Sequence, residues 1–479
     1  MTAETPGAAA PYAAIIIPIH ARPETLGASV RSALDQTVQD IHVVLVGDGV
    51  TPACRRVARE LEQVDPRVQF LDYPKAPFNG AANRDRAIRE IAAERIFYND
   101  DDDLLLPHHV EVLGPLLDEV DVVDTPVVSV RPDGLVDLGL HDSADPDTRA
   151  SVASGDYKPV FDTHLAHRRS TYLRLDGPWA AAPDRRSVLH FLQSFAAADD
   201  VTWMTTQRIT ALSFHGARRA TMPAWERRIE LERWERRVRS GLSERELRQT
   251  GEYPFHLLRL VNALRRSEVS ASQVRSRLDG IVEKIGDEAG RQAARDQLEP
   301  AIDLCFGHDE WDDRHDDAIV SLLAASLAPG FQVAGVLARY VRGQHVERIR
   351  RRLLADADSP APTDTLALFW CSARAGSVDA SEWSTRLDEV VETCHPSDRY
   401  GVMLEAGRIM LAPVGDPALA RHWCDRALDA APQTSGARGV WRLSLEIARS
   451  VGDRNREDQA AESLRRLDAG EPPGGPGAR

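Results

Sequence analysis

The sequence predicts an α/β domain in the first half of the chain and an all-α domain in the second. Up to about residue 230, short β-branched runs alternate with amphipathic segments, a pattern typical of a sheet covered by helices. After about residue 240, helical periodicity continues with helix-breaking residues at short intervals. We therefore expect an α/β domain at 13–235 and a helical domain at 236–468, with disordered ends at 1–12 and 469–479.

Composition narrows the class of protein. The chain has 479 residues, 43% of them hydrophobic, which is enough for more than one buried core. Its formal net charge is -15, and an acidic chain lacks the basic face that the phosphates of a nucleic acid require. We therefore expect no nucleic-acid partner.

Cysteine usage and the lack of a long apolar run indicate the compartment. The five cysteines are scattered and never spaced as CxxC, so neither a disulfide framework nor a zinc site is indicated. No run of 18 apolar residues occurs, and the start MTAETPGAAAPY lacks the pattern of a signal peptide. We expect a soluble, cytoplasmic protein without a transmembrane segment.

Four apolar runs are the predicted strands of the sheet. They are AAIIIPI (13–19), IHVVLVG (41–47), VQFL (68–71) and RIFYN (95–99), and helices are expected between and after them at 24–36, 52–64, 80–92 and 107–119. Runs that are apolar on both faces favour a parallel sheet covered by helices. Ligands of such sheets lie beyond the carboxyl ends of the strands.

Polar residues follow three of these predicted strands. His20 to Arg22 come after the first strand, Asp48 and Gly49 after the second, and Asp100 to Asp103 after the fourth. Because the carboxyl ends of parallel strands meet at one edge of the sheet, we expect a ligand site there.

The second half is expected to be helical throughout. The predicted helices are 243–250, 255–266, 271–286, 288–300, 316–327, 331–341, 345–354, 364–375, 379–393, 400–411, 416–431, 436–450 and 454–467. The stretch DPALARHWCDRALDAAP has small, large, small and proline residues at the spacing of a tetratricopeptide-type second helix. We favour a solenoid of helical pairs over a compact bundle.

The stretch ERIFYNDDDDLLLPHH, residues 94–109, places four aspartates directly after a buried strand. Like charges repel, and unpaired buried charge is costly, so a positive partner is expected. A strand that delivers carboxylates onto a loop suits a hard divalent cation carrying the diphosphate of a nucleotide, Mg²⁺ or Mn²⁺. Taken alone, the run would favour the alternative, a solvated acidic loop or a helix N-cap, over a metal site.

Three segments in order resemble the signatures of inverting family 2 glycosyltransferases with the GT-A fold, a Rossmann-like nucleotide-diphospho-sugar transferase fold. They are AAIIIPIHARPETLGASVRSALDQTVQDIHVVLVGDG, GAANRDRAI and YNDDDDLLLPHHVE. The resemblance covers roughly the first half of the chain. It implies a metal-dependent transfer of a sugar from a nucleotide-diphosphate donor, with inversion at the sugar.

The resemblance also implies roles for individual residues on the donor side. Asp48 would accept a hydrogen bond from the nucleobase, Arg84 would lie near the nucleotide, Asp100 or Asp101 would contact the ribose, and Asp102 would ligate the metal. His20 stands where many members of the family have a tyrosine, and it would lie against the base or simply turn the loop.

Inverting transfer needs a carboxylate general base on the acceptor side. The family places this base at an acidic residue that opens a helix after a Gly-x-Trp step. In LDGPWAAAPDRRSVLHFLQSF, this pattern makes Asp184 the candidate base, and an ordinary helix N-cap is the alternative for this residue. Asp199 and Asp200 are the fallback candidates.

Histidines provide further candidates. His215, in the segment that resembles the close of the family's domain, is a candidate to complete the metal shell, with a packed core histidine as the alternative. His164 and His167 have helical i,i+3 spacing that suggests a metal pair, but we favour a place in the acceptor pocket for them.

Two other function classes compete with a glycosyltransferase. A sugar nucleotidyltransferase would show a glycine-rich, basic phosphate loop after the first strand, which PIHARPETL lacks. A non-catalytic nucleotide-binding scaffold with tetratricopeptide-like helices is less compatible with the retained aspartates Asp48, Asp100 to Asp103 and Asp184. We therefore favour the enzyme.

The partners follow from this interpretation. A uridine-diphosphate sugar is the favoured donor because it is the family's default, and guanosine and thymidine donors stay open. The acceptor is expected to be a peptide, a protein or a glycan. A concave helical domain would hold the acceptor or a partner protein, or would mediate self-association.

Overall fold

A computed structural model describes residues 10–132, 134–180, 187–214, 219, 222–265, 270–306, 311–324, 333–355, 362–376, 378–394, 396–430 and 437–469. The chain divides into two units. Unit 1 comprises Met1–Val130, Leu135–Phe214 and Ala224–Arg295, and unit 2 comprises Arg131–Gly134, His215–Pro223 and Asp296–Arg479.

Unit 1 contains all the strands described and the helices around them. In chain order its elements are β1 (Ala13–Ile19), α1 (Pro23–Leu34), β2 (Ile41–Asp48), α2 (Pro52–Val64), β3 (Val68–Tyr73), α3 (Pro77–Glu90), β4 (Arg95–Tyr98), β5 (Leu104–Leu105), α4 (His109–Leu113), η1 (Pro115–Asp118), β6 (Val122–Asp124), β7 (Val128–Val130), β8 (Val136–Leu138), α5 (Pro146–Ala153), η2 (Asp162–His164), β9 (Leu165–Arg168), α6 (Arg169–Arg174), α7 (Ser187–Ala196), β10 (Trp203–Thr205), β11 (Ala211–Leu212), α8 (Ala224–Arg239), α9 (Glu244–Thr250), α10 (Pro254–Arg265) and α11 (Ala271–Glu283).

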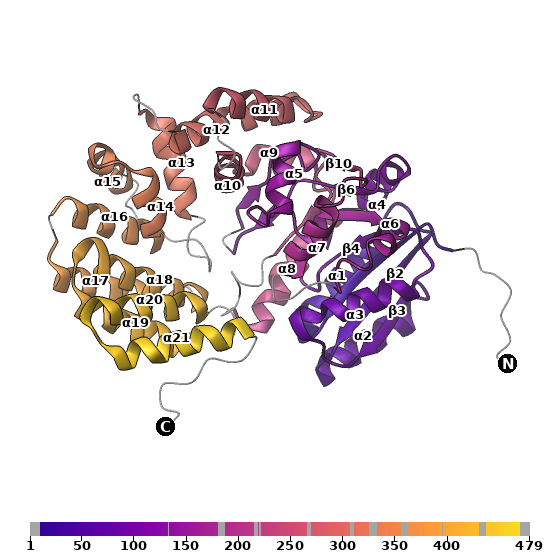
Figure 1. The fold of residues 1–479 in the computed structure, drawn as a ribbon, viewed down its shortest axis with the longest axis horizontal. Helices are drawn as coiled ribbons and strands as arrows, with labels where there is room; N and C mark the ends of the chain where they lie inside the picture. Colours follow the sequence, from indigo (N-terminus) through magenta and orange to yellow (C-terminus); the bar gives the residue numbers. More distant parts are fainter. Residues whose placement is uncertain are drawn as a thin grey trace. The chain divides into compact units, whose positions relative to one another are not determined.

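The main sheet has seven strands in the order β10-β6-β9-β4-β1-β2-β3. Of these strands, β10, β6, β4, β2 and β3 are labelled in Figure 1. Strands β4, β1, β2 and β3 run parallel, as the sequence predicts. The expectation of a purely parallel sheet is wrong at β9, which pairs antiparallel with both β4 and β6. The parallel strands still place their carboxyl ends at one edge of the sheet.

Apolar side chains cover both faces of the parallel strands. Alternate residues of β1 pack with α1, α2 and α4 in one core cluster, which includes Ile15, Leu26, Cys54 and Val110. On the other face, Tyr98 of β4 packs against Trp179 and Phe191, whose rings are stacked 4.2 Å apart. Burial on both faces explains why the predicted strands read as continuous apolar runs.

The prediction of one helix over residues 107–119 is wrong in the length of that helix. The structure has the short helix α4 and then the 3-10 turn η1, which begins at Pro115. Proline has no backbone N–H to donate and clashes with the preceding turn, so an α-helix usually ends or kinks before it. The two leucines before α4 form β5, which pairs with β11 far along the chain.

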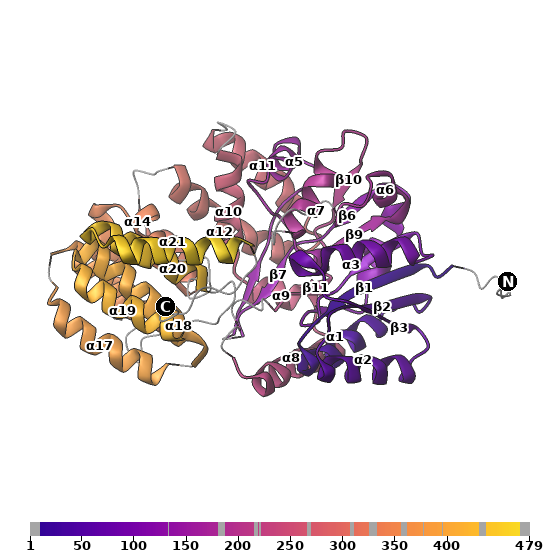
Figure 2. The same cartoon turned by 60° about the horizontal axis from the view of Figure 1, so that its bottom comes forward.

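Unit 2 is helical. Helix α12 (Glu288–Phe306) carries the chain from unit 1 into unit 2, and the other helices are α13 (Asp313–Ala324), α14 (Val333–Tyr340), η4 (Gly343–His345), α15 (Val346–Ala355), α16 (Pro362–Arg374), α17 (Ala380–Thr393), α18 (Pro396–Ile409), η5 (Met410–Val414), α19 (Pro417–Ala430), α20 (Arg438–Val451) and α21 (Arg454–Ala469). Helices α18 to α21 lie side by side in chain order (Figure 2).

Helix α19 carries the stretch that suggests a tetratricopeptide-type repeat. Its small residues Ala420, Cys424 and Ala427 are buried together with Trp423, so they form the packed face of the helix. Small residues on this face allow the neighbouring helices to approach closely. Within the ranges described above, every helix is too short or too polar to cross a bilayer.

Three buried histidines make the stability of unit 1 sensitive to acid. Burial lowers the pKa of His109 to about 3, of His164 to about 3 and of His167 to about 4. Because these folded-state values lie below the unfolded value near 6.5, the stability they contribute is present above pH 6.5 and is lost as the pH falls toward 3. Raised carboxyl pKa values nearby act in the opposite direction, so a single-residue variant isolates the histidine effect.

We expect His109→Asn to flatten this pH dependence. An asparagine amide can replace the bond that His109 Nδ1 makes to Thr210 Oγ1, 2.8 Å away, without titrating. The variant should be less stable than the wild type at pH 7, and the gap in unfolding free energy should shrink by about 2 kcal/mol at pH 5. Urea unfolding at both pH values measures this gap, and an unchanged gap would contradict the assignment.

Candidate functional site

The carboxyl ends of β1, β2 and β4 bring together most of the predicted site residues. Asp48 is the last residue of β2, and His20 follows β1 directly. Ring nitrogen Nδ1 of His20 donates to the carbonyl oxygen of Asp48 over 2.8 Å, which fixes the two strand ends to each other. The acidic run follows β4, the neighbour of β1.

Asp48 is buried and accepts three hydrogen bonds. Oδ1 accepts from the backbone N–H of Ala76 at 2.7 Å and from Asn83 Nδ2 at 2.8 Å, and Oδ2 lies 2.5 Å from Lys75 Nζ. The lysine side chain is 53% exposed, so its ammonium reaches Asp48 from the solvent side. The carboxylate is thus fixed in place and has one oxygen that faces a displaceable cation.

The chain requires glycine where α3 passes Asp48. Gly80 has a φ of +72°, and a Cβ at this position would lie 2.7 Å from Cγ of Asp48. Any other side chain would therefore push the carboxylate away or strain the helix. This close approach explains the glycine that opens the segment GAANRDRAI.

Arg22 supplies the positive charge that the acidic run lacks in the local sequence. Its Nη1 lies 2.8 Å from Asp101 Oδ1 and 2.9 Å from Asp102 Oδ1. Burial would lower the pKa of Arg22, but Asp101 and Asp102 raise it above its ordinary value. Burial raises the pKa of Asp101, and the guanidinium opposes that rise.

Asp103 has a structural part in the same loop. Its carboxylate accepts hydrogen bonds from the backbone N–H of Phe214 at 2.7 Å and from the hydroxyls of Ser213 and Thr163 at 2.8 Å each. Burial raises its pKa to about 6, and these bonds limit the rise. Asp103 therefore ties the acidic run to the segment that leads to His215.

Asp100 sits in the most negative part of the site. Burial raises its pKa well above the ordinary value, and the nearby Asp162 and Asp103 add to the rise. Its backbone is fixed at both ends, because its N–H donates to Thr163 Oγ1 and its carbonyl accepts from Ser29 Oγ. A protonated Asp100 can donate a hydrogen bond to a hydroxyl, and an ionised one can accept it.

Arg84, on α3, is a buried cation with spare donors. Its guanidinium carbon lies 4.5 Å from the centre of the Trp179 ring. Among the described residues, its Nε and Nη1 have no hydrogen-bond partner. Buried guanidinium donors without partners are costly, and the oxygens of a diphosphate could accept hydrogen bonds from them.

The site fits a metal ion that arrives with a diphosphate. Within the described ranges, no group of three or more histidine, cysteine or acidic side chains is arranged to hold an ion by itself. Mg²⁺ and similar hard ions are commonly held by only one or two carboxylates together with substrate phosphates. Asp101 and Asp102, which share one guanidinium, are such a pair.

Two predicted residues lie outside the described ranges: the candidate base Asp184 and the candidate metal ligand His215. The Gly-x-Trp step before Asp184 is described. Gly177 has a φ of +75°, and a Cβ there would lie 2.1 Å from Asp85 Oδ1, so the step requires glycine. Trp179 is buried and donates from Nε1 to the hydroxyl of Tyr98 at 3.1 Å.

The interpretation of His164 and His167 is wrong on two points. His164 ends the turn η2 and His167 lies in β9, so they do not share a helix. Both side chains are fully buried, and His167 Nε2 accepts a hydrogen bond from Tyr98 at 2.8 Å. They are core residues and are not placed to line an acceptor pocket.

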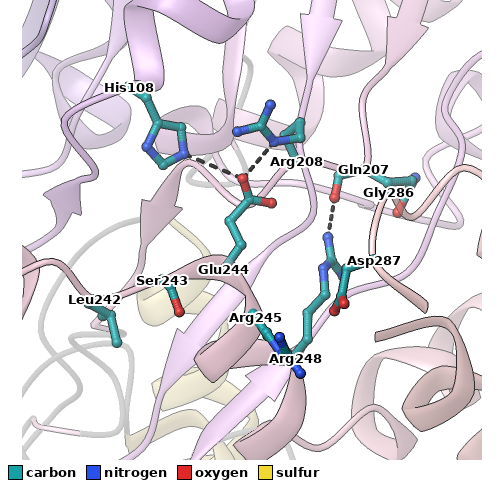
Figure 3. A pocket seen from close by; sticks show the side chains of 10 residues that line it. All are labelled: His108, Gln207, Arg208, Leu242, Ser243, Glu244, Arg245, Arg248, Gly286 and Asp287. Atoms are coloured by element: carbon teal, nitrogen blue, oxygen red, sulfur yellow. Dashed lines mark hydrogen bonds and ion pairs between the residues drawn. The ribbon is translucent and has the colours of Figure 1, made fainter. Parts of the chain in front are cut away.

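A cavity of about 570 Å³ lies elsewhere in unit 1, away from the strand-end site (Figure 3). Glu244, at the start of α9, lies between Arg208 and His108, with Oε1 at 2.6 Å from Arg208 Nε and 3.7 Å from His108 Nε2. The described residues that line the cavity include none of the predicted site residues. The ion pair fixes α9 to the segment between β10 and β11.

Comparison with known proteins identifies the domain that carries the site. Residues 14–175 match the glycosyl transferase family 2 domain. The matched residues include the strands β1 to β4, the acidic run and Arg84, which lies over the Trp179 ring. The N-terminal half is therefore an α/β domain that matches family 2 glycosyltransferases over residues 14–175, and a largely helical region follows it.

Two curated relatives match part of the chain. The glycosyltransferase GlyA of Streptococcus pneumoniae serotype 4 (strain ATCC BAA-334 / TIGR4) is 25% identical over 99 residues, 21% of this chain and 14% of the relative. The chondroitin synthase of Escherichia coli is 32% identical over 102 residues, 21% of this chain and 15% of the relative. The matches thus span only a small part of the length of these relatives.

Solved structures show only a distant likeness. The S. aureus TarS fragment 1-349 in complex with UDP-GlcNAc has 10% sequence identity and a TM-score of 0.35, over 95% of this chain and 91% of that chain. The mannosyltransferase PcManGT from Pyrobaculum calidifontis, in complex with GDP-Man and Mn²⁺, has 14% identity and a TM-score of 0.32, over 66% of this chain and 76% of that chain.

Sequence reasoning missed several residues of the candidate site. Lys75 and Asn83 contact Asp48, and Asp162 adds negative charge beside Asp100. Arg22 had a usable signal, because it follows a predicted strand at the same edge as the aspartates. Asp162 had none, since it reaches the site through the antiparallel return of the chain before β9.

Proposed function

We propose that this protein is a metal-dependent, inverting glycosyltransferase that takes its sugar from a nucleoside-diphosphate donor. The observation that carries the proposal is the set of charges at one sheet edge: a fixed carboxylate at Asp48, a buried cation at Arg84, and a carboxylate pair at Asp101 and Asp102. These groups match a nucleobase, a diphosphate and a divalent ion in turn. The family 2 domain that contains them supports the sugar-transfer chemistry.

Asp48 favours a base with a ring N–H beside a carbonyl oxygen. When Lys75 moves away, Oδ2 of Asp48 is an acceptor at the end of β2, and a carboxylate accepts but does not donate. Uracil, thymine and guanine carry a ring N–H beside a carbonyl oxygen, whereas adenine and cytosine have only an acceptor nitrogen at that position. We therefore propose a uridine, thymidine or guanosine diphosphate, with His20 beside the base and Asp100 or Asp101 at the ribose.

The diphosphate would lie between Arg84 and the aspartate pair. The two donors of Arg84 without partners among the described residues would bind phosphate oxygens. Asp102 would hold a Mn²⁺ or Mg²⁺ ion, which supplies Lewis-acid stabilisation of the leaving diphosphate when it is bound. His215 would add a ligand, and Asp103 supports this part because it binds the backbone of the preceding residue.

Asp184 would accept the proton of the acceptor hydroxyl or other nucleophile as the sugar is transferred. Its support is the Gly-x-Trp step before it, with Trp179 packed under Arg84. Proton removal by a positioned carboxylate contributes roughly 100- to 10,000-fold in rate. The acceptor class, a peptide, a protein or a glycan, stays a prediction of the sequence, as does acceptor binding by the helical domain.

A panel of nucleoside diphosphates tests the proposal. We expect UDP, GDP or TDP to raise the melting temperature in the presence of Mn²⁺, and ADP and CDP to have no effect. The reason is that only the first three offer a ring N–H beside a carbonyl oxygen to Asp48. At roughly 100 times the Kd, the stabilisation is about 2.7 kcal/mol. A response to none of the five would favour a non-catalytic scaffold, and an equal response to all five would exclude base recognition by Asp48.

A further inference from the structure

We propose that Arg22 is an internal counter-cation that holds the metal site closed until the donor arrives, and that it then binds the donor's diphosphate. This inference rests on the proposed function, because it assigns a residue to the same donor site. It adds Arg22, to which the sequence analysis assigns no individual role. It also predicts that loss of Arg22 strengthens the binding of metal alone and weakens the binding of nucleotide in the presence of metal.

The guanidinium of Arg22 blocks access to both carboxylates. One nitrogen, Nη1, lies within 2.9 Å of an oxygen from each of Asp101 and Asp102, so a single positive group bridges both carboxylates. The two aspartates are buried, whereas the Arg22 side chain is 36% exposed. The cation therefore closes the carboxylate pair from the solvent side, which is the side a metal ion must enter.

The backbone allows the side chain to leave without moving the loop. Arg22 is the N-cap residue of α1, and its carbonyl accepts the N–H of Leu26 at 3.4 Å, while Pro23 begins the helix. These contacts fix the main chain and leave the guanidinium free to change partners. A long arginine side chain of this kind can exchange one anion for another by rotation alone.

The charge balance favours exchange only when metal and diphosphate come together. With Arg22 in place, one positive group lies between the two buried carboxylates of Asp101 and Asp102, and removing it without a replacement would raise the free-energy cost of burying both charges. A divalent ion replaces that charge, but the displaced guanidinium then needs a new anion. The diphosphate, which the metal also binds, provides one with the planar geometry that arginine prefers.

Direct metal binding tests this assignment. Free Mn²⁺ is measured by electron paramagnetic resonance in titrations of the full-length protein, first alone and then with saturating UDP. We expect Arg22→Gln to bind Mn²⁺ alone roughly tenfold more tightly than the wild type, since the competing cation is gone. In the presence of Mn²⁺, the same variant should bind UDP roughly tenfold more weakly, because a phosphate partner is missing.

Two further variants separate this role from a structural one. Arg22→Lys keeps the charge and should lie between the wild type and Arg22→Gln in both titrations. Arg31→Gln is the matched control, because Arg31 is on the same helix but pairs with Glu235 at 2.7 Å, and it should leave both affinities unchanged. If Arg22 only stabilised the loop, its loss would weaken metal and nucleotide binding together, and that result would overturn the inference.

Failure of this inference is distinguishable from failure of the proposed function. If wild-type protein binds UDP with Mn²⁺ and Arg22→Gln has unchanged Mn²⁺ affinity, the proposed function stands and the role of Arg22 is wrong. If neither protein binds UDP, GDP or TDP under any metal condition, the proposed function itself is wrong.

Discussion

Replacing Asp102 by asparagine is expected to abolish metal-dependent binding of the nucleoside diphosphate while the fold stays intact. An amide has the size of the carboxylate but no charge, so the remaining Asp101 would have to balance both Arg22 and an entering ion. Hard divalent ions prefer charged oxygen ligands, and the loss should weaken binding of the diphosphate in Mn²⁺ roughly 100-fold or more.

The fold should survive this change because an amide has nearly the shape of the carboxylate and Asp103 still anchors the loop. Asp103 makes the three bonds to Thr163, Ser213 and Phe214 and keeps them in the variant. Asp118→Asn is a suitable control, since Asp118 is an exposed partner of Arg95 on η1. Calorimetric titration of both variants measures the effect, and normal affinity in Asp102→Asn would show that Asp102 does not hold the metal.

Replacing Asp184 by asparagine is expected to remove turnover and spare donor binding. A general base acts on the acceptor's proton, so its loss should lower the rate roughly 100- to 10,000-fold and leave the affinity for the donor nucleotide close to that of the wild type. With the acceptor unidentified, the rate is read as release of the nucleoside diphosphate from its sugar donor with water as the acceptor.

The fallback candidates supply the comparison for this experiment. Asp199 and Asp200 lie exposed in the turn before β10, and Asp200 is paired with Arg174. Asp199→Asn should therefore turn over donor at nearly the wild-type rate. Near-normal turnover in Asp184→Asn together with a strong loss in Asp199→Asn would move the base to the turn.

The parallel part of the fold could be predicted because its signals are local. The strands predicted at 13–19, 41–47, 68–71 and 95–99 correspond to β1 to β4 within two residues at either end, since buried parallel strands are continuous apolar runs. The short strands β5, β9 and β11 were missed. They pair with partners far away in the chain, and a two- to four-residue strand has no periodicity of its own.

The helical half was predictable as a class and less so at its boundaries. Helix α12 runs to Phe306 with Pro300 inside it, where the sequence suggests an end at residue 300. Proline usually ends or kinks a helix, but packing of the surrounding turns can outweigh that local preference. Leu298, Ala301 and Ile302 are buried on both sides of the proline, which gives the helix this packing.

The candidate site was predictable where polar residues follow strands, but the pairs that these residues form were not. Asp48 and the acidic run are recognisable in the sequence because they are charged residues directly after predicted strands. The cations that meet them, Lys75 and Arg22, come from other loops, and only the parallel order of β4, β1, β2 and β3 brings those loops together. Pairing across a sheet edge is a property of the topology, which single-sequence patterns do not encode.

The measurement that tests the central claim most directly is a calorimetric titration of UDP into the wild-type protein, once with Mn²⁺ and once with a chelator. The account predicts one binding site per chain in Mn²⁺ and an affinity at least roughly tenfold weaker in the chelator, because Asp102 acts on the diphosphate through the ion. Should the wild type bind none of UDP, GDP and TDP in Mn²⁺, the acidic run would be a structural loop neutralised by Arg22, and the account would be contradicted.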